Sequence, residues 1–470
     1  MAANLASDLD LAGELTALLG ADRVSVASDI LAEHATDKWH ASAPPDVVVL
    51  AQHRDDVVKT LRFANEHSIP VTTRGAGVGY VGGAVPVNGG IVLSVRPMDA
   101  IVEINTADGI TVVEPGVILN DLQQAVRAKG WYYPPDPASL KECSIGGNIA
   151  TNAGGPRCLK YGVTRHYVLG LEVVLANGDI LQTGSRCHKN KTGFDLIGPF
   201  VGSEGLLGVV TQATLRLIPH PEARGMLTAT FNEFSEAAEA VRRILDSRWQ
   251  PSALEITDGF TLQAARNYLG AEKLPDGNAH LIVEIDGRAE SVKGELADLR
   301  KFLETLGALT IQEAADDASC EAIWQLRRDF SYSLRETGLI KLNEDIVVPR
   351  SKLVDLVEFA HALEAETGIP VACFGHAGDG NIHTNLMVAD YDTDPVARER
   401  ADVALDKLFR WVLEIGGVIT GEHGIGLAKK RWYPDAVSEV GRQVHRSLKA
   451  ALDPQGILNP GKFVATDGQE

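Results

Sequence analysis

Two histidines stand seven residues apart in a polar stretch between two apolar runs. GHAGDGNIHTN covers residues 375–385 and places His376 and His383 between IPVACF and LMV. On one regular strand, this odd spacing would put the two side chains on opposite faces. Gly378 and Gly380 allow a turn, so two strands of a hairpin can bring both imidazoles together. The spacing therefore predicts a hairpin that presents two histidines side by side.

A carboxylate and a further histidine follow in GEHGIG, residues 421–426. Two neutral imidazoles and the carboxylate of Glu422 would form a divalent-metal site with positions open for substrate. The residues alone leave another interpretation open, in which each histidine is a hydrogen-bonded structural residue of a strand. Asp379 and Asn381 lie between the glycines, and we interpret them as turn-forming residues rather than ligands.

Three glycine-rich runs precede these clusters. RGAGVGYVGG, residues 74–83, contains a formal G-x-G-x-x-G, but Pro86 and the later glycines cannot start the helix that a Rossmann fingerprint requires. Its backbone N–H groups can still cradle a phosphate, with Arg74 at the entrance. The alternative for this loop alone is a set of tight turns between strands.

The second run, residues 134–162, lacks both alternation and helical periodicity, which predicts a long functional loop. Small donors and acceptors alternate there with glycines: Ser144, Gly146, Gly147, Asn148, Thr151, Asn152, Gly154 and Gly155. The third run, residues 198–210, repeats the composition with Glu204 and Gly208. Three such runs in one domain predict a large polar ligand, and a dinucleotide fits them better than a single phosphate.

Composition narrows the classes of function. The chain has 470 residues, 45% of them hydrophobic and 23% charged, as in an ordinary globular enzyme of two domains. A net charge of −19 argues against nucleic acid or an anionic membrane as a partner. We expect no secretion signal and no membrane span, because the N-terminus is acidic and no apolar run is long enough. The five scattered cysteines favour a reducing, cytoplasmic location.

The elements that must position these residues can be placed approximately. We expect a strand over 46–50, a helix over 55–67, a hairpin at Asn177-Gly178 and a half-buried strand over 209–217. Beyond a boundary near residue 220, strands and helices alternate as in an α+β domain, with long helices over 289–306 and 394–415. Asp394 is the expected N-cap of the last helix, and Leu405, Leu408, Phe409 and Val412 form its apolar face.

Six sequence motifs, in the order in which they occur along the chain, resemble those of the flavoprotein superfamily of vanillyl-alcohol oxidase and p-cresol methylhydroxylase. Within it, they resemble the subgroup of D-lactate dehydrogenase, the glycolate oxidase flavin subunit and D-2-hydroxyglutarate dehydrogenase. RGAGVGYVGGA is similar to the pyrophosphate loop, PPDPAS…CSIGGNIATNAGG to the central FAD segment, and FVGSEGLLGVV to the segment beside the flavin and adenine. GHAGDGNIH, GEHGIG and ILNPGK are similar to the C-terminal signature, so the match spans about residues 43–463.

The resemblance implies an α+β fold with a two-subdomain FAD-binding domain over 43–220 and a ferredoxin-like cap over 221–415. An N-terminal helical segment, 1–42, and a C-terminal segment that returns to the flavin, 416–470, complete the expected division. The residues it assigns to FAD are Arg74, Gly75, Ala76, Gly77, Val78, Gly79, Tyr80, Pro135, Asp136, Ser139, Cys143, Ser144, Gly146, Gly147, Asn148, Thr151, Asn152, Gly154, Gly155, Glu204, Gly208, Val209 and Asn459. We expect non-covalent FAD, because the pyrophosphate loop contains no His or Cys and Cys143 is not a linkage site in this subgroup.

The resemblance also implies that His376, His383 and Glu422 bind zinc or manganese and that His423 is the general base. It assigns the substrate to Arg327, Ser331, Lys341 and Asn385, where Ser331 replaces a threonine of the family. Arg327 and Ser331 are i and i+4 on an expected helix and share a face. Without the resemblance, a solvated charged helix with a snorkelling lysine would explain the same residues.

The expected activity is therefore oxidation of a D-2-hydroxy acid, such as D-lactate, glycolate or D-2-hydroxyglutarate, by hydride transfer to flavin N5. An external acceptor must reoxidise the flavin, and a quinone, an electron-transfer flavoprotein, a cytochrome or oxygen would serve. A homodimer is the expected oligomer. Three alternatives stay open: a metal-independent flavin alcohol oxidase, a flavin subunit of a multi-subunit complex, and a metallohydrolase, which would leave the glycine-rich runs unexplained.

Overall fold

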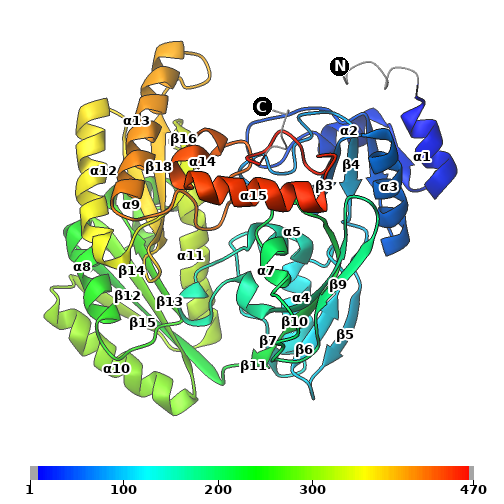
Figure 1. The fold of residues 1–470 in the computed structure, drawn as a ribbon. Coiled ribbons are helices and arrows are strands. Elements are labelled where there is room, and N and C mark those ends of the chain that lie inside the picture. The colour runs from blue at the N-terminus through cyan, green and yellow to red at the C-terminus, as the bar shows by residue number, and fades with distance from the viewer. Residues whose placement is uncertain (1–8, 465–470) are drawn as a thin grey trace.

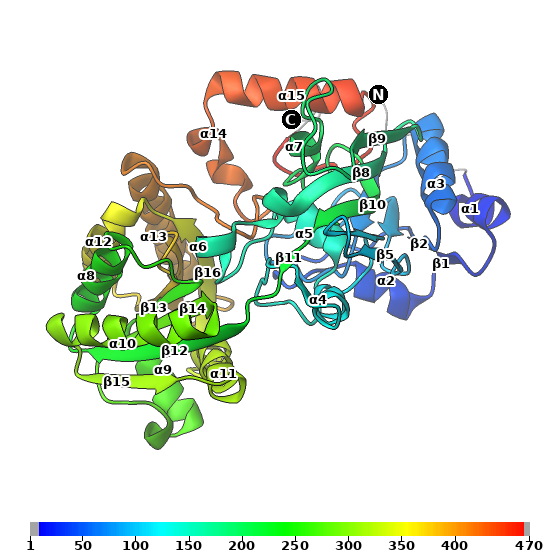
Figure 2. The same ribbon diagram turned by 90° about the horizontal axis from the view of Figure 1, so that it is seen from below.

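The computed structural model describes residues 9–464 and has two lobes (Figures 1 and 2). The first lobe begins with α1 (Leu11–Leu19), β1 (Val24–Ser25), α2 (Ser28–His34), β2 (Val47–Leu50), α3 (Arg54–His67), β3 (Val71–Arg74) and β4 (Ile91–Ser94). Strands β2, β4 and β3 are parallel, and β1 joins them antiparallel in the order β1-β2-β4-β3. The strand predicted over 46–50 and the helix predicted over 55–67 are confirmed as β2 and α3. The N-terminal segment, predicted as helical, also contributes β1 to this sheet.

A second sheet completes the lobe in the order β5-β6-β10-β8-β9, antiparallel throughout. This part of the lobe contains β5 (Ile101–Asn105), β6 (Ile110–Val113), α4 (Leu119–Arg127), β7 (Trp131–Tyr132), α5 (Ile145–Thr151), α6 (Cys158–Tyr161), β8 (Val168–Val174), β9 (Ile180–Gly184), α7 (Ile197–Phe200), β10 (Val209–Arg216) and β11 (Ile218–Pro219). Strands β7 and β11 pair with each other in a separate two-stranded sheet. The hairpin at Asn177-Gly178 joins β8 to β9 as predicted. Strand β10 alternates buried and half-buried residues, which confirms the half-buried strand.

The prediction of one long loop over 134–162 is wrong, because α5 and α6 lie within it. Gly146 and Gly147 in the first turn of α5 are poor helix formers and hide the helix from periodicity arguments. The helix forms because Ser144 is its N-cap, with a hydroxyl that accepts from the Gly147 N–H at 3.4 Å. The run at 198–210 likewise begins inside a helix, α7, rather than in a loop.

The second lobe, the cap, is built on a seven-stranded antiparallel sheet in the order β15-β12-β14-β13-β17-β18-β16. Its elements are β12 (Ala223–Phe231), α8 (Phe234–Leu245), β13 (Ala253–Thr257), α9 (Gly259–Leu269), β14 (Ala279–Gly287), α10 (Ala289–Thr305), β15 (Thr310–Ala314), α11 (Asp317–Arg335), β16 (Ile340–Val347), α12 (Leu353–Thr367), β17 (Val371–His376), β18 (Asn381–Val388) and α13 (Pro395–Glu414). The first four strands, with α8 and α10, have the order of a ferredoxin-like unit, and three more strands extend it.

The two faces of the cap sheet differ in composition. Residues Leu254, Ile256, Cys373, Ile382 and Leu386 point into a large apolar core with α8, α10, α12 and α13. Alternate residues of the same strands point to the opposite face, because side chains alternate along a strand. On that face, the sheet carries Glu255, Glu284, Lys341, Asn343, Asp345, His376, His383 and Asn385. The period of two thus gathers the polar residues of five strands on one surface.

The chain then returns to the first lobe through α14 (Tyr433–Ala436) and α15 (Glu439–Leu452), and α15 lies beside α7 (Figures 1 and 2). The buried ammonium of Lys449 donates to the carbonyls of Leu206 and Leu458 and to the carboxylate of Asp453. Asn459 N–H donates to the carbonyl of Val71 at 2.7 Å, which joins the segment to β3. The expectations for the extreme N-terminus fall partly on residues 1–8, outside the described residues.

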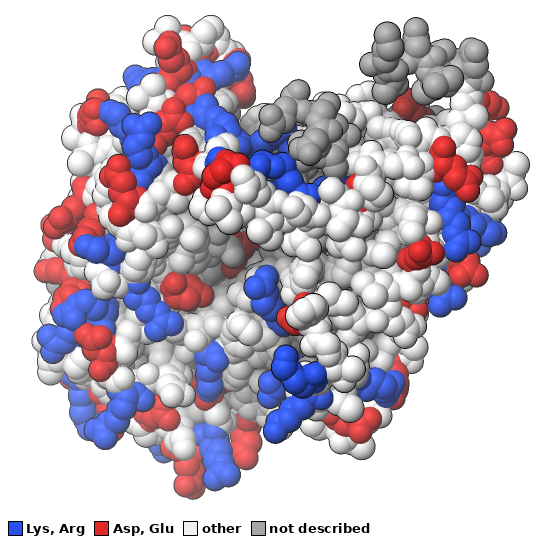
Figure 3. Space-filling view, viewed as in Figure 1, with Lys and Arg blue, Asp and Glu red and all other residues white. Residues whose placement is uncertain are grey.

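None of the helices within residues 9–464 is long and apolar enough to cross a membrane. On the face shown in Figure 3, acidic and basic side chains are interspersed.

Candidate active site

A cavity of about 1470 Å³ lies between the first lobe and the polar face of the cap sheet. We call the wall from the first lobe the glycine half. Of the residues predicted to bind FAD, this half contains Gly75, Ala76, Gly77, Val78, Gly79, Tyr80, Asp136, Ser139, Cys143, Ser144, Gly146, Gly147, Asn148, Thr151, Gly154, Glu204, Gly208 and Val209. We call the wall from the cap and the GEHGIG loop the charged half. It contains Arg327, Ser331, His376, His383, Glu422 and His423.

The glycine half is suited to a polar ligand. Thr73 Oγ1 and Asn148 Nδ2 are buried in its wall without a hydrogen-bond partner among residues 9–464. A buried donor or acceptor without a partner costs about 1–3 kcal/mol, so a ligand that supplies the missing partners would be stabilised there. Asn148 is one of the residues predicted to bind FAD, whereas Thr73 was not predicted to do so.

Five residues predicted to bind FAD do not line the cavity: Arg74, Pro135, Asn152, Gly155 and Asn459. Arg74 was expected at the loop entrance, but its guanidinium donates to the carbonyls of Thr36 and Glu33. Asn459 Nδ2 donates to the carbonyls of Gly83 and Glu204. These two side chains hold neighbouring segments in place, and any contact of theirs with FAD stays a prediction.

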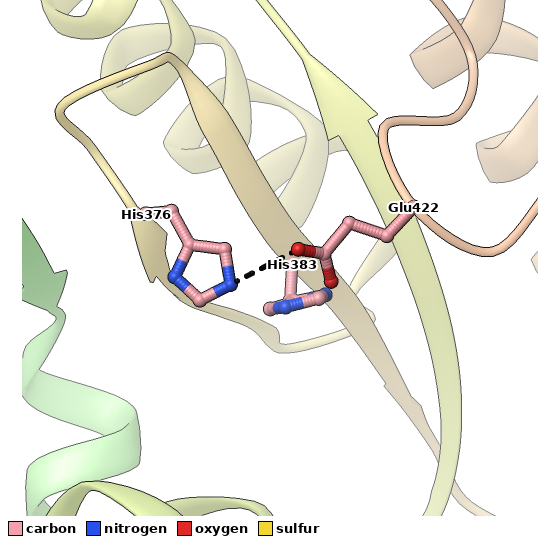
Figure 4. Close-up of side chains that lie close together, drawn as sticks. All are labelled: His376, His383 and Glu422. Carbon is pink, nitrogen blue, oxygen red and sulfur yellow. Dashed lines mark ion pairs between the residues drawn. The ribbon is translucent and has the colours of Figure 1, made fainter. Parts of the chain in front are cut away.

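The three predicted metal ligands converge in the charged half (Figure 4). His376 ends β17, His383 lies in β18, and Glu422 comes from the loop after α13, with ligand atoms all within 4.8 Å of one another. His376 Nε2 is 3.5 Å from Glu422 Oε1, close to the ~3.4 Å that separates tetrahedral ligands of one zinc ion. Gly154 borders the group, because a Cβ there would lie 2.8 Å from Glu422 Oε1. The predicted hairpin is confirmed, and it brings the His376 and His383 side chains together as predicted.

The charges around these residues favour a cation. Burial raises the pKa of Glu422 to about 7. Burial would lower the pKa of His376, but the carboxylates of Glu255 and Glu422 raise it to about 10. Burial holds the pKa of His383 well below its usual range, and its Nδ1 has no hydrogen-bond partner in the described chain. The neutral His383 imidazole and the Glu422 carboxylate are donors for a divalent ion, which would replace the proton that His376 carries between two carboxylates.

Asn381, predicted to form the turn, is instead the first residue of β18. It pairs with His376 across the hairpin, and its Nδ2 donates to Asp345 Oδ1 at 2.7 Å. The strand begins there because the amide finds buried partners on β16. Asp379 does belong to the turn, where its Oδ1 accepts from the Asn381 N–H.

Asp345 holds the loop that carries Glu422 and His423. Its Oδ2 accepts from the Thr420 hydroxyl and from the N–H groups of residues 421–423, at 2.8–2.9 Å. The His423 ring is stacked with Tyr80, with ring centroids 5.2 Å apart, and with His383, with ring centroids 5.7 Å apart. Burial lowers the pKa of His423, so its imidazole is neutral and able to accept a proton at neutral pH.

The predicted substrate residues are only partly brought together at the wall. Arg327 and Ser331 share one face of α11 and line the cavity, as predicted. Lys341 lies behind them and donates to Ser331 Oγ at 2.8 Å. Asn385 lies on the same sheet face as His383, but its Nδ2 donates to the carbonyls of Ala372 and His383, and it does not line the cavity.

Sequence reasoning missed three buried carboxylates around the cavity: Glu255, Glu284 and Asp345. It assigned Glu204 to FAD but did not predict the contacts that the structure gives this side chain. Glu204 accepts from the N–H groups of Ile425 and Gly426 at 2.8 Å each and so anchors the GEHGIG loop. Glu284 accepts from Arg157 of the first lobe and from Trp324 of α11, which joins the lobes. A charged residue inside an apolar strand such as ALEIT was the available signal, because such a residue must find a partner.

Comparison with known proteins agrees with this architecture. Residues 45–184 match the family described as "FAD binding domain", and residues 220–463 match "FAD linked oxidases, C-terminal domain". The chain is 39% identical to glycolate oxidase subunit GlcD of Bacillus subtilis, over 91% of this chain and 90% of that protein. It is 33% identical to D-lactate dehydrogenase of Anaerostipes hadrus, over 94% of each.

Solved structures show the same fold at low sequence identity. p-Cresol methylhydroxylase with bound substrate superposes with a TM-score of 0.79 at 21% identity, covering 97% of this chain and 96% of that chain. Alkyldihydroxyacetonephosphate synthase gives 0.72 at 19% identity, covering 96% and 84%. The predicted α+β fold with a p-cresol methylhydroxylase-type FAD-binding domain is thereby confirmed. The chain belongs to the FAD-linked oxidases and is an oxidoreductase of the D-lactate dehydrogenase and glycolate oxidase GlcD type.

Proposed function

We propose that this protein is an FAD- and divalent-metal-dependent dehydrogenase that oxidises a D-2-hydroxy acid to the 2-oxo acid. One observation carries the proposal most strongly. His376, His383 and Glu422 offer ligand atoms within 4.8 Å of one another in the cavity of an FAD-linked oxidase, with the His423 ring beside them. The relatives named for glycolate and D-lactate support a 2-hydroxy acid as substrate.

Two imidazoles and one carboxylate suit zinc or manganese and leave coordination positions for two substrate oxygens. A divalent ion there would lower the pKa of a coordinated hydroxyl, as it lowers that of water from ~16 to ~7. The hydroxyl and carboxylate oxygens of a 2-hydroxy acid are close enough to chelate one ion. This requirement would select 2-hydroxy acids over simple alcohols.

The remaining steps are the transfer of a proton and of a hydride from the substrate. His423, neutral and held by the loop that Asp345 anchors, accepts the hydroxyl proton, a step that typically contributes ~10²–10⁴-fold. Bound FAD supplies a two-electron acceptor for the C2 hydride at N5. Loss of one proton and one hydride leaves the C2 carbonyl of the 2-oxo acid. The two electrons pass on to an external acceptor: a quinone, an electron-transfer flavoprotein or a cytochrome.

The cations of α11 and β16 would attract the substrate carboxylate. Arg327 lines the cavity beside Ser331, and Lys341 stands behind it as a second positive charge. A fixed chelate and a fixed flavin expose only one face of C2, which favours the D enantiomer. We propose that Asn385 orients the same substrate indirectly, through the backbone of His383, whose carbonyl it contacts at 3.0 Å.

A screen of D- and L-2-hydroxy acids with an artificial dye acceptor, with and without EDTA, tests the proposal. We expect reduction of the dye by one or more D acids, loss of activity on chelation, and recovery with Zn²⁺ or Mn²⁺. Indifference to exhaustive chelation would favour a metal-independent flavin oxidase instead. Acid precipitation in the same experiment should release the flavin to the supernatant, as expected for non-covalent FAD.

A second arrangement is favoured by the name of the Bacillus relative, which is a subunit of glycolate oxidase. In that arrangement, the chain would work within a larger assembly instead of as a cytoplasmic homodimer. Light scattering of the purified chain, together with its turnover on the dye, separates the two. A dimer that turns over alone supports the homodimer, whereas a monomer without turnover supports the assembly.

A further inference from the structure

Glu255 is a fully buried carboxylate that joins two different parts of the charged half. It lies in the middle of β13, opposite His376 in the register of β13 and β17. Its Oε1 is 2.6 Å from His376 Nδ1, and its Oε2 accepts from Arg327 Nε at 2.7 Å. One carboxylate therefore touches a proposed metal ligand and a proposed substrate cation at the same time.

The contact with His376 determines which ring nitrogen can bind a metal. A carboxylate is an acceptor, so Nδ1 keeps its proton, and Nε2 is the nitrogen that can exchange its proton for a metal ion. Nε2 is the nitrogen that faces Glu422 at 3.5 Å. A hydrogen bond from the remote nitrogen of a ligand histidine to a carboxylate orients the ring and raises its basicity.

The contact with Arg327 leaves the substrate end of that side chain free. Glu255 occupies Nε, and the guanidinium lies over the Phe374 ring at 4.7 Å from its centroid. The two terminal nitrogens have no hydrogen-bond partner in the described part of the chain, and the residue lines the cavity. The planar guanidinium is thus fixed with its bidentate edge available to a carboxylate.

We propose that Glu255 is a positioning residue that sets both the metal affinity of His376 and the carboxylate-binding orientation of Arg327. The inference rests on the proposed metal-dependent function. Through this one side chain, the substrate-binding cation and the metal site share a rigid connection. A change at Glu255 should therefore weaken metal binding and substrate binding together, although Glu255 contacts neither ligand.

The test is Glu255→Gln, measured on the FAD-loaded protein. Both partners of Glu255 are donors, whereas an amide has one accepting oxygen. One of the two hydrogen bonds is therefore lost, and the other is no longer assisted by a negative charge, without a change of shape. We expect the Kd for Zn²⁺, measured by competition with a chromogenic chelator, to rise about 10–100-fold. At saturating zinc, the KM for the hydroxy acid should remain raised by about tenfold, while kcat recovers to a greater extent.

Glu284→Gln is the matched control. Glu284 is equally buried, lies on the same sheet face in the neighbouring strand, and also pairs with an arginine, but it does not contact His376 or Arg327. We expect its Kd for zinc to equal that of the wild-type protein. If both variants weaken zinc binding equally, the effect is a general loss of stability and the inference is overturned.

The remaining outcomes separate the inference from the proposed function. If Glu255→Gln binds zinc as tightly as the wild type, the inference fails and the metal-dependent function stands. If the wild type oxidises hydroxy acids but binds no zinc or manganese, both fail. Should Glu255→Gln not fold, the wild type labelled with ¹⁵N-histidine gives the answer. The signal that is lost in His376→Gln must show a protonated Nδ1 in the zinc-loaded protein, and a proton on Nε2 would contradict the inference.

Discussion

The two halves of the cavity present different surfaces to their ligands. The glycine half is made of backbone and small side chains from segments such as residues 75–79 and 144–154. The charged half is made mainly of longer, titratable side chains. Buried Glu255 holds His376 and Arg327, and buried Asp345 holds the loop that carries His423. The glycine half suits a large polar group that is bound by shape and backbone hydrogen bonds, and the charged half suits a reaction that moves a proton and a negative charge. Substitutions in the glycine half should therefore change FAD affinity, whereas substitutions in the charged half should change catalysis.

The largest effect should come from the charged half. His423→Gln removes the proposed general base and should lower kcat about 10²–10⁴-fold. FAD occupancy, measured by absorbance near ~450 nm, should stay at the wild-type level because the glycine half is intact. A variant that loses its flavin along with its activity would contradict the separation of the halves.

A large effect on stability is expected where the halves meet. Glu284, fully buried, receives Arg157 from the first lobe and Trp324 from the cap. Glu284→Gln should lower the free energy of unfolding by about 3 kcal/mol, at the lower end for a broken buried pair, because Asp136 still faces Arg157. Urea denaturation measures this change. An unaltered midpoint of urea denaturation would mean that the contact between the two lobes does not depend on this ion pair.

The glycine half should respond through cofactor affinity. Gly77 has φ +70°, and a Cβ there would lie 2.1 Å from a guanidinium nitrogen of Arg74. Gly77→Ala imposes backbone strain of about 1–3 kcal/mol, so the Kd for FAD should rise about tenfold or more, with kcat per bound FAD little changed. Gly83→Ala is the control in the same loop, since its nearest neighbour would be 3.9 Å away. Equal loss of FAD in both variants would show that the effect does not depend on the backbone conformation of Gly77.

The two halves also differ in how much of them could be predicted from the sequence. Motif order was enough to predict the FAD-binding fold and the proximity of His376 and His383 to Glu422. The histidine spacing and the glycines between them were enough to predict the hairpin. The buried partners were beyond reach, because Glu255 lies 121 residues from His376 in the chain, and only the register of β13 and β17 brings them together. Helix α5 was missed because glycines that line the cavity weaken the helical pattern.

The smallest effect expected is a pH dependence of substrate binding. Burial, with Arg335 and Arg327 nearby, lowers the pKa of Lys341 to about 7. Lys341 is therefore cationic below about pH 7 and becomes neutral above it, while a hydroxy acid keeps its carboxylate ionised throughout. The KM should rise about threefold to fivefold between pH 6 and 8, as expected for loss of roughly 1 kcal/mol of attraction. Lys341→Met should make the KM independent of pH, and a persisting slope would assign the effect to another group.

Anaerobic mixing of the purified, FAD-loaded protein with D-lactate tests the central claim most directly. Bleaching of the flavin absorbance near ~450 nm reports the hydride transfer without any external acceptor. We predict bleaching by a D-2-hydroxy acid and not by its L enantiomer, loss of bleaching after the metal is removed, and recovery when Zn²⁺ or Mn²⁺ is added back. Undiminished bleaching by protein shown to be free of metal would contradict the account.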